Sequence, residues 1–189
     1  MLICGIDEAG RGPLAGPVVA ACVIMPETIQ LDDVKDSKKL KESERERLFE
    51  IIKNNCVEYR IESIDNNKID EINILNATML AMERCLDNLK MSGVKVLVDG
   101  NYFKLNRDKQ KAYNYETIVG GDDKIIQISA ASILAKVTRD RMMIEYDKIY
   151  PLYNFKKHKG YGTKEHIENI KKFGLCDIHR ISFCKKFIQ

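Results

Sequence analysis

The chain has 189 residues, a length that fits one domain spanning 1–189, with a hydrophobic core that needs no disulfide or metal to hold it. Its composition, 44% hydrophobic and 31% charged, is that of a folded globular protein and excludes extensive disorder. The longest apolar run, 16–25, is far shorter than the ~20 residues that span a bilayer, and the N-terminus lacks the basic segment of a signal peptide. We therefore expect a cytoplasmic protein that makes no membrane contact, and nothing in the composition demands more than a monomer.

Apolar runs and helical periodicity predict the following elements in chain order: strands at 2–6 and 18–25, a helix near 44–54, a strand at 57–64, a helix at 72–91, strands at 94–98 and 115–119, and helices at 128–149 and 163–173. The tight Gly- and Pro-rich connection at 10–17 favours an antiparallel first pair of strands. Ser43 and Glu46 form a capping-box pattern at the first helix. This order predicts a mixed sheet covered by helices, in one compact α/β domain.

Charge is unevenly distributed along the chain. The net charge is +3, but the segment 156–189 holds nine Lys or Arg against three Asp or Glu, and all three histidines lie there as well. A basic segment beside an acidic remainder suits a polyanionic partner held near a carboxylate cluster. The charge alone is explained at least as well by a solvent-exposed helix face.

The six cysteines show no pair with the C-x-x-C spacing of metal or redox sites. Cys4, Cys22 and Cys85 fall within apolar patterns, where cysteine behaves as a small hydrophobic residue. A domain of this size needs no disulfide scaffold, so we predict reduced structural thiols.

Acidic residues follow three of the predicted strands. Asp7 and Glu8 follow the first, Asp99 follows the strand at 94–98, and Asp122 with Asp123 follows the one at 115–119. The carboxyl ends of neighbouring strands meet at one edge of an open sheet, where α/β proteins commonly bind ligands. Carboxylates gathered there repel one another unless cations such as Mg²⁺ neutralise them. Acids and Asp-Gly pairs also occur in ordinary turns, so the spacing alone leaves both interpretations open.

Several segments, in order and nearly end to end, resemble the motifs of the ribonuclease HII family: 7–17 (DEAGRGPLAGP), 36–40 (DSKKL), 98–101 (VDGN), 121–122 (GD) with 129–140 (SAASILAKVTRD), 159–163 (KGYGT) with His166, and 179–183 (HRISF). The resemblance implies the ribonuclease H fold, a five-stranded mixed sheet flanked by helices. It also implies that Asp7, Glu8, Asp99 and Asp122 are the catalytic acids and bind a divalent metal, Mg²⁺ or Mn²⁺. Asp123 is a less secure neighbour, because the family's acid directly follows the glycine.

The resemblance also implies a set of substrate-binding residues. The backbone of Gly10, Arg11 and Gly12 is expected to approach the ribose, because glycine has no Cβ to prevent it. Ser37 and Lys38 join this set, with Lys38 on phosphate. Tyr161 is expected to stack on a sugar and to help detect the 2′-hydroxyl, the group that distinguishes RNA from DNA.

Other residues carry weaker expectations. The small side chains at 129–135 indicate close helix packing rather than a phosphate site. His158 and His166 are predicted to lie at the surface, and His179 to have a structural or phosphate-contacting role. Ile181 departs from the family pattern, which often has a basic residue there. The connection at 10–16 lacks the ending of a nucleotide-binding P-loop, so ATP binding is disfavoured.

The implied activity is endonucleolytic hydrolysis of the RNA strand in RNA–DNA hybrids, and incision 5′ to single ribonucleotides in duplex DNA. Two-metal catalysis would leave a 3′-hydroxyl and a 5′-phosphate. One alternative is a ribonuclease HIII-type enzyme, which would need an additional N-terminal domain before Asp7. Another is a resolvase- or transposase-like nuclease, which would lack the Gly10–Gly12 and Tyr161 motifs. A non-catalytic nucleic-acid-binding module is the third, and it would have no need of four acids that repel a polyanion.

Overall fold

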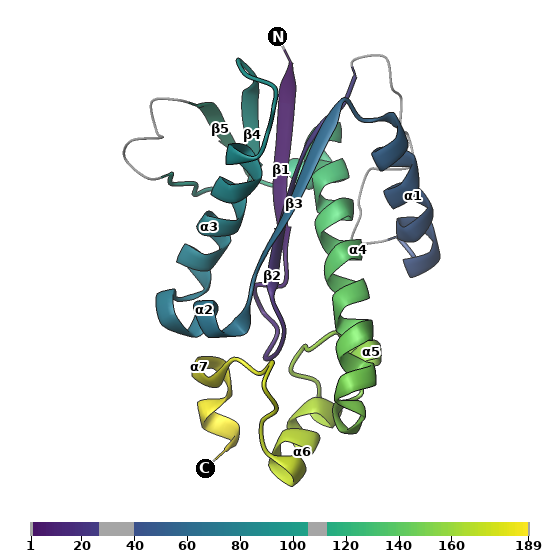
Figure 1. The fold of residues 1–189 in the computed structure, drawn as a ribbon, viewed down its shortest axis with the longest axis vertical. Coiled ribbons are helices and arrows are strands. Elements are labelled where there is room, and N and C mark those ends of the chain that lie inside the picture. The colour runs from purple at the N-terminus through teal and green to yellow at the C-terminus, as the bar shows by residue number, and fades with distance from the viewer. Residues whose placement is uncertain (1, 27–39, 106–112, 189) are drawn as a thin grey trace.

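The computed structural model describes residues 2–26, 40–105 and 113–188 (Figure 1). Its centre is a five-stranded sheet in the order β3-β2-β1-β4-β5. The strands are β1 (Ile3–Ala9), β2 (Val18–Ile24), β3 (Glu58–Ile64), β4 (Lys95–Asp99) and β5 (Asn114–Ile118). β1 pairs with β2, and β2 with β3, in antiparallel fashion, whereas β1–β4 and β4–β5 are parallel. The predicted mixed five-stranded α/β fold is therefore confirmed.

Helices cover both faces of this sheet (Figure 1). The helices are α1 (Glu42–Asn55), α2 (Asn66–Ile72), α3 (Ile74–Asp87), α4 (Ile126–Ile149), α5 (Phe155–His158), α6 (Lys164–Phe173) and α7 (Ile181–Cys184), with 3₁₀ turns at Gly121–Asp123 (η2), Pro151–Tyr153 (η3) and Lys185–Phe187 (η4). α3 packs on one face and α1 with α4 on the other. Within the described residues, no helix is long and apolar enough to cross a membrane.

β2 shows why the sheet is covered on both sides. Its seven residues are all fully buried, with Ala20 and Cys22 facing α3 while Val19, Ala21 and Val23 face α1 and α4. A strand buried on both faces has a continuous apolar sequence instead of an alternating one. Cys22 lies with Cys4 and Cys85 in the α3-side core, and all six cysteines of the chain are free thiols.

α4 lies unusually close to the centre of the sheet. A Cβ at Gly5 of β1 would lie 2.1 Å from the backbone carbon of Gln127, so only glycine allows this approach. The small residues that follow in α4, including Ala130, Ala131 and Ala135, are fully buried. The close helix packing predicted for 129–135 is therefore confirmed, and it holds α4 against the strand that carries Asp7 and Glu8.

The C-terminal part of the chain packs under the connection between β1 and β2. Leu14 and Ala15 of that connection share a buried cluster with Phe155, Ile170 and Cys184, among other residues. A β-bridge joins Ala15 to His179, and Leu14 exchanges backbone hydrogen bonds with Gly160 and Arg180. In Figure 1 this segment forms the yellow-green lower end of the molecule. The fold thus brings 151–188 against 10–17.

Three local predictions were wrong. β1 does not end at Ile6 but continues to Ala9, because β2 keeps pairing with it up to Ala9↔Val19, so Asp7 and Glu8 lie inside the strand. The helix predicted at 72–91 is broken at Asn73, whose φ of +66° ends α2 and whose side chain caps α3 through Asn76 N at 3.0 Å. Helix α1 begins after Lys41 rather than Ser43.

Candidate active site

Three carboxylates are positioned by the pairing of β1 with β4. Ile6 pairs with Val98 in parallel register, so the next residue of each strand, Asp7 and Asp99, lie side by side where β4 ends. Glu8 follows Asp7 and points to the other side of the strand, as the alternation of a β-strand requires. The structure therefore brings Asp7 and Asp99 together, as expected from the sequence.

The electrostatics of this group show how close the acids are. Asp7 is only 5% exposed and its Oδ1 accepts a hydrogen bond from Glu8 N at 2.7 Å. Burial, and then the charges of Glu8 and Asp99, raise the pKa of Asp7 well above its usual range. Burial also raises the pKa of Glu8, with Arg11 Nη1 opposing this effect from 3.3 Å. Asp7 and Glu8 are therefore harder to ionise than solvent-exposed acids, first because they are buried and then because Asp99 carries a like charge.

Asp122 is brought to the same region by the 3₁₀ turn η2. Asp99 Oδ1 accepts a hydrogen bond from Gly121 N at 2.8 Å, which ties the turn to the end of β4. A Cβ at Gly121 would lie 2.5 Å from Ile128 Cδ1, so the turn can pack this tightly only with glycine. Asp122 is buried, its carbonyl oxygen accepts from the Ser129 hydroxyl, and Asp123 beside it is exposed. The buried position distinguishes Asp122 from its neighbour.

This donor set fits a hard divalent cation by its chemistry. The charges of Glu8 and Asp99 help to raise the pKa of Asp7, a repulsion that a bound Mg²⁺ or Mn²⁺ would relieve, and carboxylate oxygens are the ligands that such ions prefer. Among the described residues, however, no three His, Cys, Asp or Glu side chains form a ready-made metal cage. Asp7 Oδ1 and Asp99 Oδ1 accept backbone N–H groups instead.

Two hollows adjoin the acids, with Glu8 in the wall of both. The first, of about 200 Å³, is lined by Glu8, Arg11, Leu75, Met79, Met82, Asp99, Gly100, Asn101 and Tyr102. The second, of about 320 Å³, is lined by Glu8, Ala9, Gly10, Arg45, Ser132, Lys136 and Tyr161. The second hollow therefore joins the acidic edge to the residues expected to bind substrate.

Gly12 and Tyr161 meet beside this second hollow although they lie far apart in the sequence. A Cβ at Gly12 would lie 3.8 Å from Tyr161 Cε1, and the Tyr161 ring is 43% exposed. Arg11 and Gly12 are exposed as well. The structure thus places the exposed ring of Tyr161 next to the exposed backbone of Gly12. The other two expected binding residues, Ser37 and Lys38, lie outside the described residues.

Sequence reasoning missed two cationic residues of the second hollow. Arg45 extends from α1, and its guanidinium donates to the Leu40 carbonyl. Lys136 extends from α4, pairs with Asp140 at 2.8 Å and lies 6.0 Å from the centre of the Tyr161 ring. Lys136 follows Ser132 by one helical turn, a spacing that could have placed both on one face of α4. No sequence signal indicated that α1 would reach the site.

The surface position predicted for His158 and His166 was wrong. Both are buried, as is His179. His166 Nε2 lies 3.0 Å from His179 Nε2, and His166 Nδ1 lies 2.9 Å from the Tyr161 carbonyl oxygen. Burial lowers the pKa of His166 and of His179 to about 4, so both rings are neutral at pH 7. The surrounding lysines suggested a solvated segment, but the aromatic cluster around Phe155 encloses the rings instead.

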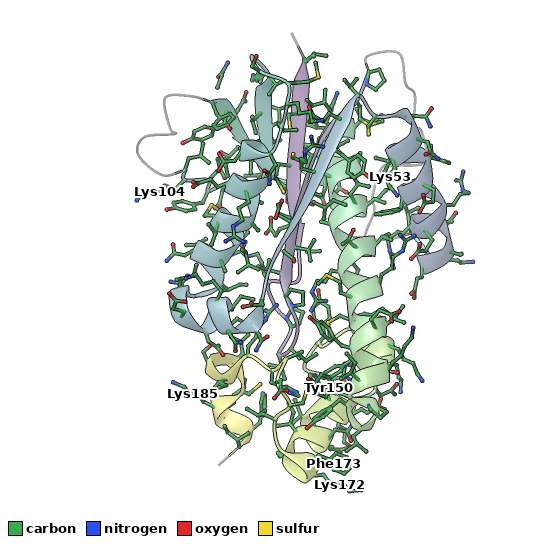
Figure 2. The ribbon with its side chains drawn as sticks, in the orientation of Figure 1. Lys53, Lys104, Tyr150, Lys172, Phe173 and Lys185 are labelled. Carbon is green, nitrogen blue, oxygen red and sulfur yellow. The ribbon has the colours of Figure 1, made fainter. Side chains whose placement is uncertain are left out.

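The basic segment 156–188 is likewise only partly exposed. Lys172 extends beside Phe173 at the lower end of the molecule, and Lys185 extends from the left side of that end (Figure 2). Arg180, by contrast, is fully buried. Seven of the nine basic residues are exposed, so the segment presents most of its positive charge at the surface.

Comparisons with known proteins agree with the motifs. The ribonuclease HII family model matches residues 4–186. A ribonuclease HII of Endomicrobium trichonymphae is 57% identical over 96% of this chain and 84% of its own length, and one of Caldicellulosiruptor bescii is 53% identical over 99% and 88%. The crystal structure of ribonuclease H2 from Pyrococcus horikoshii OT3 is 28% identical, with a TM-score of 0.81 over 99% of this chain and 97% of that one. The chain therefore belongs to the ribonuclease HII family, and it is a metal-dependent endoribonuclease, a hydrolase.

Proposed function

We propose that this protein hydrolyses the RNA strand of RNA–DNA hybrids and also incises duplex DNA on the 5′ side of a single ribonucleotide. Membership of the ribonuclease HII family supports endonuclease activity on hybrids. The observation that carries the proposal for single ribonucleotides is the meeting of Gly12 and Tyr161 beside Glu8, since an exposed ring and an exposed glycine backbone there can contact one sugar. Such a contact involves a single ribose, so it does not require a run of ribonucleotides.

We assign the metal-binding and catalytic role to Asp7, Glu8, Asp99 and Asp122. The raised pKa of Asp7 and of Glu8 and the burial of Asp122 support this assignment. These four carboxylates would hold the divalent cations, Mg²⁺ or Mn²⁺, which would supply the Lewis acidity for activating a water and for stabilising the leaving oxygen of a phosphodiester. The protein's own contribution is to hold the four carboxylates within β1, at the end of β4 and in η2, on a sheet buried by helices on both sides.

The second hollow suits the strand that carries the ribonucleotide. Arg45 and Lys136 supply positive charge beside Glu8, and a phosphate near them would be held by ionic hydrogen bonds. Lys38, with Ser37, belongs to the same phosphate-binding group on the strength of the family motif. Tyr161 stacks on the sugar, while Gly10, Arg11 and Gly12 approach its 2′-hydroxyl with their backbone.

The position of the cut determines the products. On the 5′ side of a ribonucleotide, the scissile phosphate lies next to the 3′-oxygen of the preceding deoxynucleotide, out of reach of the 2′-hydroxyl. A water must therefore attack phosphorus; the bond to the 3′-oxygen breaks, and that oxygen takes up a proton. The products are a 3′-hydroxyl and a 5′-phosphate.

The test is a DNA duplex that carries one ribonucleotide and a label, incubated with the protein and Mg²⁺ or Mn²⁺ and resolved on a sequencing gel. We expect one cut, 5′ to the ribonucleotide, that EDTA abolishes. The matched control is the same duplex with deoxyribose at that position, which should stay intact. Equal cutting of the control, or products ending in a 2′,3′-cyclic phosphate, would refute the proposal.

A further inference from the structure

Two arginines are buried beneath the connection between β1 and β2. Arg180 is 0% exposed and Arg139 is 1% exposed, which makes them the largest fully buried side chains among the described residues. Buried arginines usually pair with carboxylates, because an isolated buried charge is costly. The three nitrogens of each guanidinium here donate to backbone carbonyl oxygens instead, so these side chains hold the backbone of the connection in place.

The two side chains divide this connection between them. Arg180 donates to Gly10 O at 2.6 Å, to Arg11 O at 3.0 Å and to Gly16 O at 3.0 Å. Arg139 donates to three other carbonyl oxygens, those of Ala15, Pro17 and Lys159, at 2.9–3.1 Å. Arg180 therefore holds the beginning of the connection, where Gly10 and Arg11 lie.

The direction of these carbonyls fixes the direction of the neighbouring N–H groups. In a trans peptide the C=O of one residue and the N–H of the next point in opposite directions, and no described peptide bond is cis. Because the carbonyls of Gly10 and Arg11 point inwards to Arg180, the N–H groups of Arg11 and Gly12 point outwards. They emerge where the backbone is exposed and the ring of Tyr161 is near. Successive outward N–H groups form a concavity that binds anionic or hydroxyl oxygens.

The geometry requires an arginine that is itself held in place. Its planar fork carries donors in fixed directions, whereas a lysine offers one ammonium on a flexible stem. The backbone of Arg180 is anchored to the same connection, because Arg180 N donates to Leu14 O at 2.8 Å and its neighbour His179 bridges to Ala15. Burial lowers the pKa of Arg180 only to about 9, so its guanidinium is charged at pH 7.

We propose that Arg180 is a positioning residue for ribonucleotide recognition: it aims the N–H groups of Arg11 and Gly12 at the oxygens of a ribonucleotide in the substrate strand. Arg180 touches neither substrate nor metal in this role. The inference rests on the proposed function, because it assumes that the exposed backbone of Arg11 and Gly12 meets a ribose. In this way the buried guanidinium sets the direction of the surface N–H groups that contact the ribonucleotide.

The first test compares wild type with Arg180→Lys, which keeps the charge and loses the fork. On a duplex with one ribonucleotide we expect kcat/KM to fall by roughly a hundredfold, the effect of a displacement of about 1 Å in a recognition contact. Mn²⁺ affinity, measured by calorimetry, should remain unchanged, because the acids belong to β1, β4 and η2. In Arg180→Ala, millimolar guanidinium should restore part of the lost activity, and urea at the same concentration should not.

Leu86→Ala is the matched control for lost stability, because Leu86 is a residue of α3 that is buried in the hydrophobic core between this helix and the sheet. It should lower the melting temperature while keeping the wild-type ratio of activity on the single-ribonucleotide duplex to activity on a long hybrid. If Arg180→Lys folds and also keeps that ratio, the inference is overturned. If wild type itself shows no preference for the ribonucleotide, it is the proposed function that fails.

A second measurement does not depend on the folding of an Arg180 variant. In the otherwise unchanged Asp99→Asn protein, which should bind substrate without cutting it, the amide resonances of Arg11 and Gly12 can be followed by ¹⁵N NMR. Both should shift when the ribonucleotide duplex binds, and much less with the all-DNA duplex. Resonances that do not respond to the ribonucleotide would overturn the inference.

Discussion

The acidic edge of the sheet and the adjoining connection at 10–17 are held by opposite chemistry. At the acidic edge, burial raises the pKa of Asp7 and of Glu8, and the charge of Asp99 raises both further. Across the connection, two buried guanidiniums donate to five of its backbone carbonyls and to that of Lys159, and no acid takes part in these hydrogen bonds. The first region gathers like charges, whereas the second gathers complementary partners.

The difference indicates which region is complete before its ligand arrives. The connection is preorganised, because its carbonyls are already bonded and its N–H directions are fixed. The acidic edge carries repulsion that only protons or cations relieve. Cations should therefore stabilise the folded protein through the first region, by mass action on the native state. Substrate recognition by the second region should require little rearrangement.

The largest effect is expected from removing one acid. Asp99→Asn keeps the shape of the side chain but removes a negative ligand, so cleavage should fall by more than the roughly 10–100-fold that loss of an outer-shell group costs. Without metal the variant should be as stable as wild type or slightly more so, because carboxylate repulsion is relieved. Gel assays at saturating Mg²⁺ and thermal melts in EDTA measure both effects.

The matched control is Asp123→Asn, because Asp123 is exposed beside the buried Asp122. It should keep wild-type activity. If Asp99→Asn cleaved substrate at the wild-type rate, Asp99 would not be a catalytic acid, and the role proposed for the acidic edge would be wrong.

A smaller effect, on the stability of the fold, is expected when the pH is lowered, because two buried histidines lie beneath the connection at 10–17. His166 and His179 support the backbone of Tyr161, and their pKa is about 4 in the folded protein against an ordinary value of 6.5. At a pH between these two values, the histidines therefore bind protons in the unfolded chain but not in the folded protein. Their contribution to stability is fully present above about pH 6.5 and is lost as the pH falls towards 4, by about 2 kcal/mol per histidine at pH 5.

Urea unfolding at pH 7.5 and pH 5 measures this loss. His166→Gln should remove one histidine's share of the pH dependence, while the raised pKa of Asp7 and Glu8, which acts in the opposite direction, stays the same in both proteins. An identical pH dependence in wild type and His166→Gln would show that this histidine does not titrate on unfolding.

The comparison also explains what could be predicted from the sequence. Apolar runs predicted the five strands, and acids at or near strand ends predicted that Asp7 and Asp99 would meet. Both predictions combine local sequence patterns with the general rule that the carboxyl ends of neighbouring strands meet at one edge of the sheet. The exact end of β1 was missed, because it depends on how far β2 continues to pair, and the break at Asn73 was missed, because a positive φ interrupts an otherwise periodic pattern.

The support of the second region was predicted only in outline: His179 was expected to have a structural or phosphate-contacting role, and Arg180 appeared only as part of the motif at 179–183. Both residues also belong to the basic segment. A count of charges records residue types but does not show which backbone groups the side chains contact. Their function depends on carbonyls of Gly10 and Arg11 that are distant in the sequence. Buried polar side chains that bond to the backbone leave no periodic pattern, so only the folded chain reveals them.

The smallest effect, and the one that sharpens the comparison most, is expected from Tyr161→Ala. The ring lies beside Gly12 and is exposed, so its removal should leave the fold intact, and a stacking contact is worth about 1–3 kcal/mol. On a duplex with one ribonucleotide only one register is productive, and we expect incision to slow by about tenfold. A long hybrid offers many registers, so its cleavage should slow less. The test is to measure the cleavage rates of both substrates with the same enzyme preparation. The control is Phe173→Ala, because Phe173 is an exposed aromatic residue of α6 that lines neither of the two hollows beside the acids. Equal slowing of both substrates would mean that Tyr161 holds the strand in general and does not sense the single ribose.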